Sequence, residues 1–440
     1  MPNFLNLFSF CNSPENRTVE YLSSVYSDIG RLTEVIEEIT KDQLKAESIR
    51  SKKVLLKPNW VTHSTRPKDH LCLRTNDNFV LSILTYILKN NPSKVIIADA
   101  PIQRCEWDKM LSFPFLAEIG KLSDKFNIPV EIIDLRRKKI NIRQRNIVTG
   151  GRPLSDYVIV DVGGLSYLEP ITIPNETRFR VTCYDPERMR EAHSQGIHKY
   201  CIGKEFFEAD VIISLPKIKT HEKTGITGAL KNLVGINGDK DFLPHHRIGG
   251  TRRGGDCYPG NSILRYWAEL ALDRANHRSV GSWYWRYVSA ILWRLSIPGP
   301  EHHLAAGWYG NDTVWRMVLD LNLIAEYGRP NGTISQFKQR QIFSICDAII
   351  AGQGDGPLRP EPLPLGIVSF TDNSAQNDRI MAILMGLDPD KIPLFKNSFH
   401  TTDLQSITLN GKQIEMDKLT HFAQSALLPA GWNNYLYRSK

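Results

Sequence analysis

The sequence has few cysteines, and none are spaced as ligands of a metal or cluster. The 440 residues include seven cysteines and no C-x-x-C pair. A zinc ribbon or a ferredoxin-type cluster needs closely spaced thiolates, so we expect neither a structural zinc ribbon nor an iron–sulfur cluster. Their odd number and wide spacing also argue against a disulfide framework and predict a reducing, cytoplasmic location. The cysteines are Cys11, Cys72, Cys105, Cys183, Cys201, Cys257 and Cys346.

Long apolar runs and blocks of like charge are also missing. No uncharged stretch reaches the length of a transmembrane helix, and Met1–Cys11 lacks the basic start and cleavage site of a signal peptide. The formal net charge of +8 is spread along the chain. A nucleic-acid binder concentrates such charge in a stripe or tail, so we expect no nucleic-acid partner. A small anionic metabolite or a membrane surface fits this balance.

What is present is the alternation of an α/β protein. Short buried runs at 54–56, 95–97 and 130–133 alternate with helical patterns at 78–88 and 107–126. This order predicts a mostly parallel sheet flanked by helices. Strand-like runs between Gly150 and Gly203 predict an antiparallel elaboration, which includes a strand at Phe179–Cys183.

We expect four segments along the chain. They are an N-terminal helical extension (1–50), a first part of the α/β core (51–250), a helical insertion (251–340), and a second part of the core with the C-terminal tail (341–440). The insertion is rich in Trp and Tyr, with two helices and a break near Gly281. Its stretch Trp283–Trp293 is interpreted either as a buried hairpin or as a surface that contacts a membrane or a protein partner.

Polar residues follow two predicted strands directly. Lys57 and Asn59 come after the first strand, and Asp99 comes after the second. Ligands of open α/β sheets bind beyond the carboxyl ends of the strands, which makes these three residues candidates for the site. Arg74, just before the next helix, is a candidate anion contact. The alternatives are a lysine that extends from a strand end to solvent and an aspartate in a turn.

The densest segment runs from Ile213 to Gly235. A buried strand there leads into Lys217, Lys219 and His221, and Lys231-Asn232 follow on a helix start. Neighbouring ammonium groups lower one another's pKa, which makes a lysine a usable base or nucleophile. We therefore predict Lys219, His221, Lys217 and Asp99 as catalytic. Lys57, Asn59, Lys231, Asn232 and Arg74 are predicted to bind substrate, and a solvated lysine cluster is the alternative.

A glycine-rich stretch follows a later strand. Gly354, Asp355 and Gly356 are predicted to let the backbone approach the substrate, although a tight turn also explains them. The stretch is neither a Walker A loop nor a dinucleotide fingerprint. Asp378 is a further residue that we expect to face the cleft. The basic segment from His245 to Arg253 is interpreted as a lid over an anion, with a metal site at its two histidines as the alternative.

These segments resemble the family called domain of unknown function 362. The matching pieces are Lys57-Pro58-Asn59, Ala98-Asp99-Ala100-Pro101, Leu215–His221, Gly228–Gly235 and Gly354-Asp355-Gly356-Pro357. The resemblance implies the fold and the place of the site better than it implies a reaction. Some members carry a ferredoxin-like module, which the cysteines here do not support. Segment 251–340 resembles a longer subgroup, associated with bacterial gene sets for surface polysaccharides.

The expected function is an enzyme that acts on a small anionic metabolite bearing carboxylate or phosphate. His221 is the expected acid/base, and isomerisation and group transfer both fit. One alternative is a non-catalytic assembly protein that docks through its Trp-rich helices. Another is a metal-cofactor isomerase similar in fold to the nickel-dependent lactate racemases, so a divalent metal stays open as a cofactor.

Overall fold

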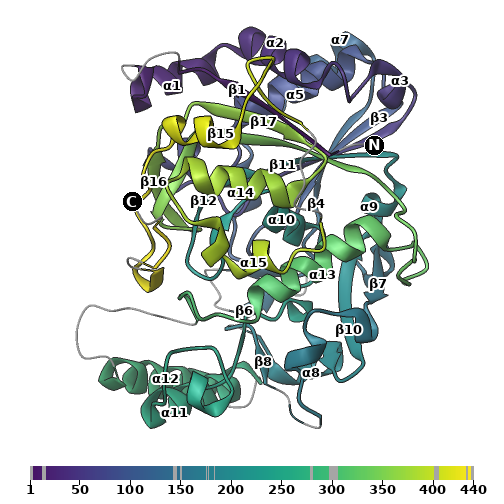
Figure 1. The fold of residues 1–440 in the computed structure, drawn as a ribbon. Coiled ribbons are helices and arrows are strands. Elements are labelled where there is room, and N and C mark those ends of the chain that lie inside the picture. Colours follow the sequence, from purple (N-terminus) through teal and green to yellow (C-terminus); the bar gives the residue numbers. More distant parts are fainter. Residues whose placement is uncertain are drawn as a thin grey trace.

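A computed structural model describes most of the chain, and Figure 1 shows its fold. The described residues are 3–11, 16–141, 146–148, 151–174, 176, 178–182, 184–277, 281–296, 306–400, 406–432 and 435–437. Cys183, the predicted end of one strand, lies outside them. Among the described helices, none combines the length and the apolar character that crossing a bilayer requires. The six described cysteines are all buried free thiols.

A large sheet of 12 strands forms the centre of the molecule. Its parallel part has the order β15-β11-β2-β3-β4. On the other side of β15, β17 pairs antiparallel with both β15 and β1, and β18 then pairs parallel with β1. The predicted mostly parallel α/β sheet is therefore confirmed. The strands are β1 (Phe4–Ser9), β2 (Lys53–Pro58), β3 (Lys94–Asp99), β4 (Val130–Asp134), β11 (Val211–Leu215), β12 (Lys217–His221), β13 (Gly225–Thr227), β15 (Ile342–Asp355), β16 (Arg359–Leu363), β17 (Ile367–Thr371), β18 (Ser406–Leu409) and β19 (Lys412–Gln413).

Side chains alternate across this sheet and divide the core into two layers. Val54 and Leu56 of β2 pack into one layer, whereas Leu55 between them packs into the other. This period of two is the reason that the buried runs in the sequence are apolar at every position. Figure 1 shows the helices of the two layers on opposite sides of the sheet. One layer contains α1 (Val19–Ser27), α2 (Ile29–Thr40), α5 (Asp77–Lys89) and α7 (Phe113–Phe126), and the other contains α10 (Ala229–Asn232), α13 (Val314–Tyr327), α14 (Ser374–Leu384) and α15 (Pro393–Lys396).

Small sheets and short helices complete the fold. The predicted antiparallel elaboration is present, because β7 and β10 pair antiparallel. Its strands and those of the other small sheets are β5 (Lys139–Asn141), β6 (Asn146–Val148), β7 (Tyr157–Asp161), β8 (Phe179–Arg180), β9 (His193–Ser194), β10 (Ile197–Gly203) and β14 (His246–Arg247). The short helices are α3 (Ala46–Ile49), α4 (Asp69–Cys72), α6 (Trp107–Met110), α8 (Pro186–Ala192), α9 (Lys204–Glu208) and α16 (Met416–Leu419).

Two of the predicted segments differ from the structure. Segment 1–50 contains three helices, but it also contains β1, which pairs with β17 and β18 inside the central sheet. In segment 251–340, the last helix α13 packs on the sheet as part of the core layer. Only α11 (Ile263–Asn276) and α12 (Ser282–Ser296) form the separate hairpin that the aromatic pattern predicted, with Gly281 at the break.

The hairpin of α11 and α12 lies at the opposite end of the molecule from α1 and α2 (Figure 1). The two helices pack on each other, yet a stripe of large apolar side chains on α12 stays exposed. Trp283, Tyr287, Ile291 and Leu295 follow one another at intervals of four residues, so they share one face of the helix. Trp267 of α11 is 56% exposed. The interpretation of this segment as a hairpin buried on the sheet is therefore wrong.

Candidate functional site

One cavity of about 360 Å³ lies beyond the carboxyl ends of β2 and β3, beside β12. We call it the lysine cavity, because five lysines line it. It brings together seven residues that the sequence predicted: Lys57, Asn59, Asp99, Lys219, His221, Lys231 and Asn232. Glu222, Lys223, Lys240, His245, Gln103 and Thr227 line it as well. Its volume suits a small metabolite.

A buried ion pair forms one wall. The Lys57 Nζ lies 2.7 Å from Asp99 Oδ1, and the other carboxylate oxygen accepts from the Trp60 backbone N–H at 2.7 Å. Lys57 also donates to Asn232 Oδ1 at 3.1 Å. Gly235 permits this packing, since a Cβ there would lie 1.9 Å from Asp99 Oδ1. Burial lowers the pKa of Lys57, and the Asp99 carboxylate opposes that effect.

Strand β12 carries Lys219 and His221 into the cavity wall. The Lys219 side chain is fully buried, and its ammonium group donates to the Leu73 carbonyl. No carboxylate pairs with it among the described contacts. Burial, followed by the charge of Lys231, lowers its pKa to about 7. The sequence predicted repulsion from Lys217 as the cause, but burial is the larger effect and Lys231 is the nearer source of charge.

Helix α10 supplies Lys231 and Asn232, and a carboxylate from α14 fixes its start. Asp378 accepts from the backbone N–H groups of Ala229 at 2.6 Å and Leu230 at 3.0 Å. Gly228 is required, because a Cβ there would lie 2.2 Å from Asp378 Oδ1. Asp378, which we expected to face the cleft, therefore caps α10. Burial and nearby lysines, Lys240 first, lower the pKa of Lys231 to about 7.

The two histidines of the cavity have opposite hydrogen-bonding roles. His221 Nδ1 accepts from the Lys223 backbone N–H at 3.0 Å, which places the proton of the neutral ring on Nε2. His245 Nδ1 lies 2.7 Å from the Leu243 carbonyl, so it must donate, and Nε2 keeps its lone pair. Burial and nearby lysines hold both pKa values well below the usual range. His221 is thus a donor and His245 an acceptor.

Several polar atoms of the cavity wall are buried without a hydrogen-bond partner. They are Asn59 Oδ1, both amide atoms of Gln103, and Thr227 Oγ1. Leaving such an atom unpaired costs about 1–3 kcal/mol. Their clustering in one cavity makes it a place where a polar ligand or ordered water molecules can bind.

Lys217 lies outside the cavity, contrary to the prediction. Its ammonium is 2.9 Å from Asp347 Oδ2 and 3.0 Å from the Tyr26 hydroxyl, and all three side chains are buried. Tyr26 donates to the other Asp347 oxygen at 2.5 Å. Burial lowers the pKa of Lys217 although Asp347 opposes the shift. Lys217 therefore joins β12 to the layer of α1 and α5 and has a structural role.

Arg74 and the glycine-rich stretch also lie outside it. Arg74 forms a two-pronged ion pair with Asp77, at 2.7 and 2.9 Å, in the first turn of α5. Strand β15 continues through Gly354 to Asp355 and pairs with β16 instead of forming a loop. Gly356 meets β12 so closely that a Cβ would lie 1.9 Å from the Thr220 carbonyl oxygen. Gly356 thus serves strand packing, whereas Gly354 has a φ of 75°. The residues after them, Pro357 and Leu358, reach the cavity.

Sequence reasoning missed Lys240, Gln103 and Glu222, and it assigned His245 to a lid. Lys240 donates to the Ala100 carbonyl at 3.1 Å, and burial, opposed by Asp99, lowers its pKa to about 8. Glu222 lies inside the dense segment 213–235, so its carboxylate next to His221 could have been recognised from the sequence as a candidate site residue. Lys240 begins a short 3-10 helix (Lys240–Phe242) and Gln103 lies in a turn, and no sequence pattern marks either residue.

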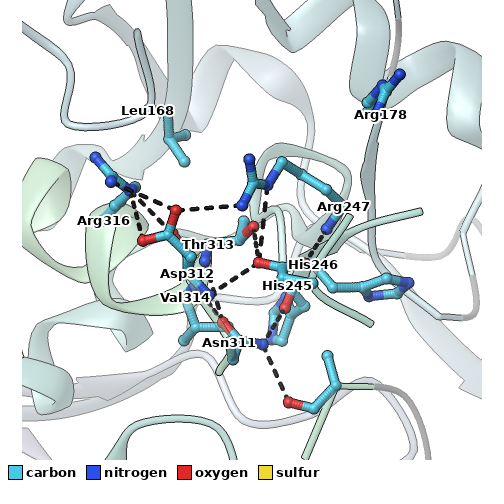
Figure 2. Close-up of polar contacts among 12 residues, drawn as sticks. Leu168, Arg178, His245, His246, Arg247, Asn311, Asp312, Thr313, Val314 and Arg316 are labelled. Atoms are coloured by element: carbon cyan, nitrogen blue, oxygen red, sulfur yellow. Dashed lines mark hydrogen bonds and ion pairs between the residues drawn. The ribbon is translucent and has the colours of Figure 1, made fainter. Parts of the chain in front are cut away.

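The predicted lid from His245 to Arg253 is for the most part packed in place. Figure 2 shows its first residues held by 311–316: Asn311 donates to the His245 carbonyl at 2.9 Å, and Arg247 donates to Asp312 at 3.2 Å. Ile248 to Gly250 are buried, and only 251–254 are exposed. The segment is therefore packed structure, and His245 is its residue that lines the cavity. The ring of His246 points away from the contacts with 311–316 (Figure 2).

The chain is similar to known proteins over parts of its length. The sequence model of the family described as "Domain of unknown function (DUF362)" matches residues 172–382. The chain is similar to the thylakoid-associated protein sll1697 of Synechocystis sp., with 23% identity over 200 residues, 46% of this chain and 40% of that protein. A crystal structure of a Thermotoga maritima protein aligns with 79% of this chain and 56% of its own, at 10% identity and a TM-score of 0.32. This chain thus spans less than two thirds of either protein.

Proposed function

Taking as premise that residues 172–382 are a DUF362 segment, we propose that this protein is an enzyme acting on a small anionic metabolite that bears a carboxylate or phosphate. The observation that carries the proposal is the lysine cavity itself. Lys219, Lys231 and Lys240 surround one space, with pKa values lowered to about 7, 7 and 8. Five lysines but only two carboxylates, Asp99 and Glu222, are among the residues that line this space. The excess of positive charge favours binding of an anion, whose charge offsets the repulsion between the ammonium groups.

The unpaired polar atoms of the cavity wall indicate which groups the ligand carries besides its anionic group. Asn59 Oδ1 accepts only, so it needs a donor such as a hydroxyl group, while Gln103 and Thr227 can both donate and accept. A ligand with an anionic group and one or more hydroxyls, such as a sugar phosphate or a hydroxycarboxylate, satisfies both sets. Such ligands suit the surface-polysaccharide context that the subgroup resemblance implies.

The two histidines support proton transfer as the chemistry. A bound anion offsets the nearby lysine charges that, in addition to burial, lower the pKa of His245, so the Nε2 lone pair of this ring can then take a proton from the substrate. The His221 Nε2–H polarises a substrate oxygen. Lys219 and Lys231 exchange protons near neutral pH because of their lowered pKa values. Of the acid/base role expected for His221, the Nε2–H suits the acid part, and we assign proton abstraction to His245. Isomerisation by proton transfer is then favoured over group transfer.

A metal-dependent reaction has less support in this cavity. Within the described part of the chain, no three His, Cys, Asp or Glu side chains come together at the lysine cavity as a metal-ligand group. We therefore assign no step to a metal ion there.

The first test uses thermal shift followed by proton exchange. Sugar phosphates, nucleotides and hydroxycarboxylates are screened for a rise in melting temperature, and the ligands that bind are incubated in D₂O to detect deuterium incorporation. We expect His245→Ala to lower the exchange rate by roughly 10² or more, in line with the loss of a general base. Lys204→Gln, at an exposed lysine of α9, is the control and should leave binding and exchange unchanged. Binding without exchange in any ligand class would contradict the proton-transfer assignment.

A second function, docking on an anionic membrane surface, is favoured by the α11–α12 hairpin. Its exposed stripe combines Trp283 and Tyr287 with aliphatic side chains, and α12 has two arginines and no acidic residue. Aromatic rings and basic groups on one helix suit the interface of a bilayer with anionic lipid. The name of the Synechocystis relative associates that protein with a membrane, which supports the proposal.

Vesicle co-sedimentation tests the docking. We expect the protein to bind vesicles containing phosphatidylglycerol more tightly than vesicles of phosphatidylcholine alone. The double variant Trp283→Ser/Tyr287→Ser should weaken binding by roughly tenfold or more, because each buried aromatic contributes about 1.5–3 kcal/mol. Phe337→Ser removes an aromatic ring of similar exposure, 75%, outside the hairpin and should have no effect. Equal binding by both variants would rule out the hairpin as the docking surface.

A further inference from the structure

A second cluster of chemically reactive side chains lies away from the lysine cavity. His246 from β14, Cys257 from the loop after it, and Glu269 from α11 each offer one ligand atom, and these atoms lie within 4.8 Å of one another. Their side chains are almost fully buried, with exposures of 4%, 1% and 5%. Imidazole, thiolate and carboxylate are the three ligand types that zinc sites in proteins use.

The backbone around the cluster folds back to bring these residues together. The Cys257 N–H donates to the Gly249 carbonyl at 3.1 Å, and the Gly249 N–H donates to Glu269 Oε2 at 2.9 Å. Gly255 allows the chain to pass this close to Gly249, since a Cβ there would lie 2.1 Å from the Gly249 carbonyl oxygen. The loop thus forms a shell of backbone contacts around the cluster, and Glu269 is oriented by one of them, as ligands of metal sites are.

The three side chains already face one another. Glu269 Oε1 lies 3.4 Å from His246 Nε2, and the Glu269 carboxylate accepts a hydrogen bond from the Cys257 thiol. His246 Nδ1 is buried without a hydrogen-bond partner, which indicates a further polar group beside this ring. Asp273, which borders the same side of the cluster, pairs with Arg180 at 2.9 Å. A small cavity of about 20 Å³, bordered by His246 and Glu269, has room for one water molecule.

We propose that His246, Cys257 and Glu269 bind a structural zinc ion, with a water molecule from the small cavity as the fourth ligand. The charges balance, because the thiolate and the carboxylate together neutralise Zn²⁺ in a buried place where net charge is costly. On binding, the Cys257 S–H bond breaks and its proton leaves to solvent as the Zn–S bond forms. No electrons are exchanged.

The ion joins the α11–α12 hairpin to the wall of the lysine cavity. Glu269 belongs to α11, whereas His246 follows directly after His245, which lines the cavity and is held by Asn311 (Figure 2). The two adjacent rings therefore serve different sites. Because this role is structural, the zinc site stands independently of the reaction proposed for the cavity.

Metal analysis of the purified full-length protein tests the site. After addition of zinc and gel filtration, we expect about one zinc ion per chain by inductively coupled plasma mass spectrometry. Cobalt substitution should give the near-ultraviolet thiolate-to-cobalt band. Cys257→Ser should abolish that band and weaken zinc binding by roughly tenfold or more, and the control Cys201→Ser, at another buried thiol, should change neither.

A second variant covers the case in which Cys257→Ser does not fold. Glu269→Gln keeps the shape and the thiolate, so the cobalt band should persist while zinc affinity falls by roughly tenfold. A wild-type protein that takes up no zinc and shows no cobalt band would overturn the proposal. So would a cobalt band of full strength in folded Cys257→Ser, or zinc affinity unchanged in Glu269→Gln.

Discussion

At the scale of single residues, the presence of a carboxylate decides what a buried lysine does. Lys217 and Lys219 are two residues apart on β12 and are both fully buried. Lys217 has Asp347 beside it and forms a structural ion pair. Lys219 has a backbone carbonyl instead, and its pKa falls from 10.5 to about 7. That difference corresponds to about 5 kcal/mol between its charged and neutral forms.

The lowered pKa of Lys219 makes a prediction about stability. Below pH 7 the native state must hold a buried ammonium group that the unfolded chain solvates freely, so the penalty is full there. It disappears as the pH rises from about 7 towards 10.5, where the unfolded lysine also loses its proton. Lys219→Met should therefore stabilise the protein by roughly 2 kcal/mol or more at pH 6 and by less at pH 9, as measured by urea denaturation.

Lys217→Met is the matched control for that experiment. It leaves Asp347 buried without its partner, so it should destabilise the protein by about 3–5 kcal/mol. If Lys219→Met destabilised the protein as much as Lys217→Met does, the account of Lys219 as an uncompensated charge would be wrong.

At the scale of elements, the short helix α10 depends on a residue far along the chain. Its four residues are too few to be stable alone, and Asp378 of α14 accepts from its first two N–H groups. This cap holds Lys231 and Asn232 at the cavity. The position of the site is therefore set by a contact between two helices.

Removal of this cap tests the dependence. Asp378→Asn replaces one accepting oxygen by an NH₂ group that faces a backbone N–H, so we expect a loss of about 1–2 kcal/mol in the free energy of unfolding. Sulfate binding in the lysine cavity should weaken as well, because Lys231 moves. Asp417→Asn, at an exposed aspartate, should change neither in urea denaturation or calorimetry. A loss of stability with unchanged sulfate affinity would show that α10 is positioned by other contacts.

Sequence patterns predicted those helices and strands whose type is determined by residues close to them in the sequence. The buried runs of β2, β3 and β11 and the helical period of α5 have the expected types at nearly the expected bounds. Strand β15 differs, because its glycines read as a loop, whereas Gly352 is needed for close approach to Lys219 of β12 and Gly354 for its positive φ. Strand β1 was missed since only pairing with β17, more than 350 residues away, makes it a strand.

At the scale of the whole molecule, three distant stretches meet at one cavity. The rule that ligands bind beyond the carboxyl ends of strands predicted the convergence of Lys57, Asp99 and Lys219. It could not place Lys240 or Gln103, because tertiary packing determines the path of the chain at both residues. It also could not separate Lys217 from Lys219, since the difference is the Asp347 carboxylate on a neighbouring strand.

The most direct test of the cavity as an anion site is proton uptake on sulfate binding. Sulfate does not titrate near neutral pH, so protons taken up on binding go to the protein. In calorimetry at pH 7.5 in buffers of different ionisation enthalpy, we predict uptake of up to about one proton, because the anion raises the lowered pKa values of Lys219 and Lys231. Affinity should fall from pH 6.5 to 8.5, and Lys231→Gln should weaken it by roughly tenfold. Sulfate binding with no proton uptake and the same affinity at both pH values would contradict the account.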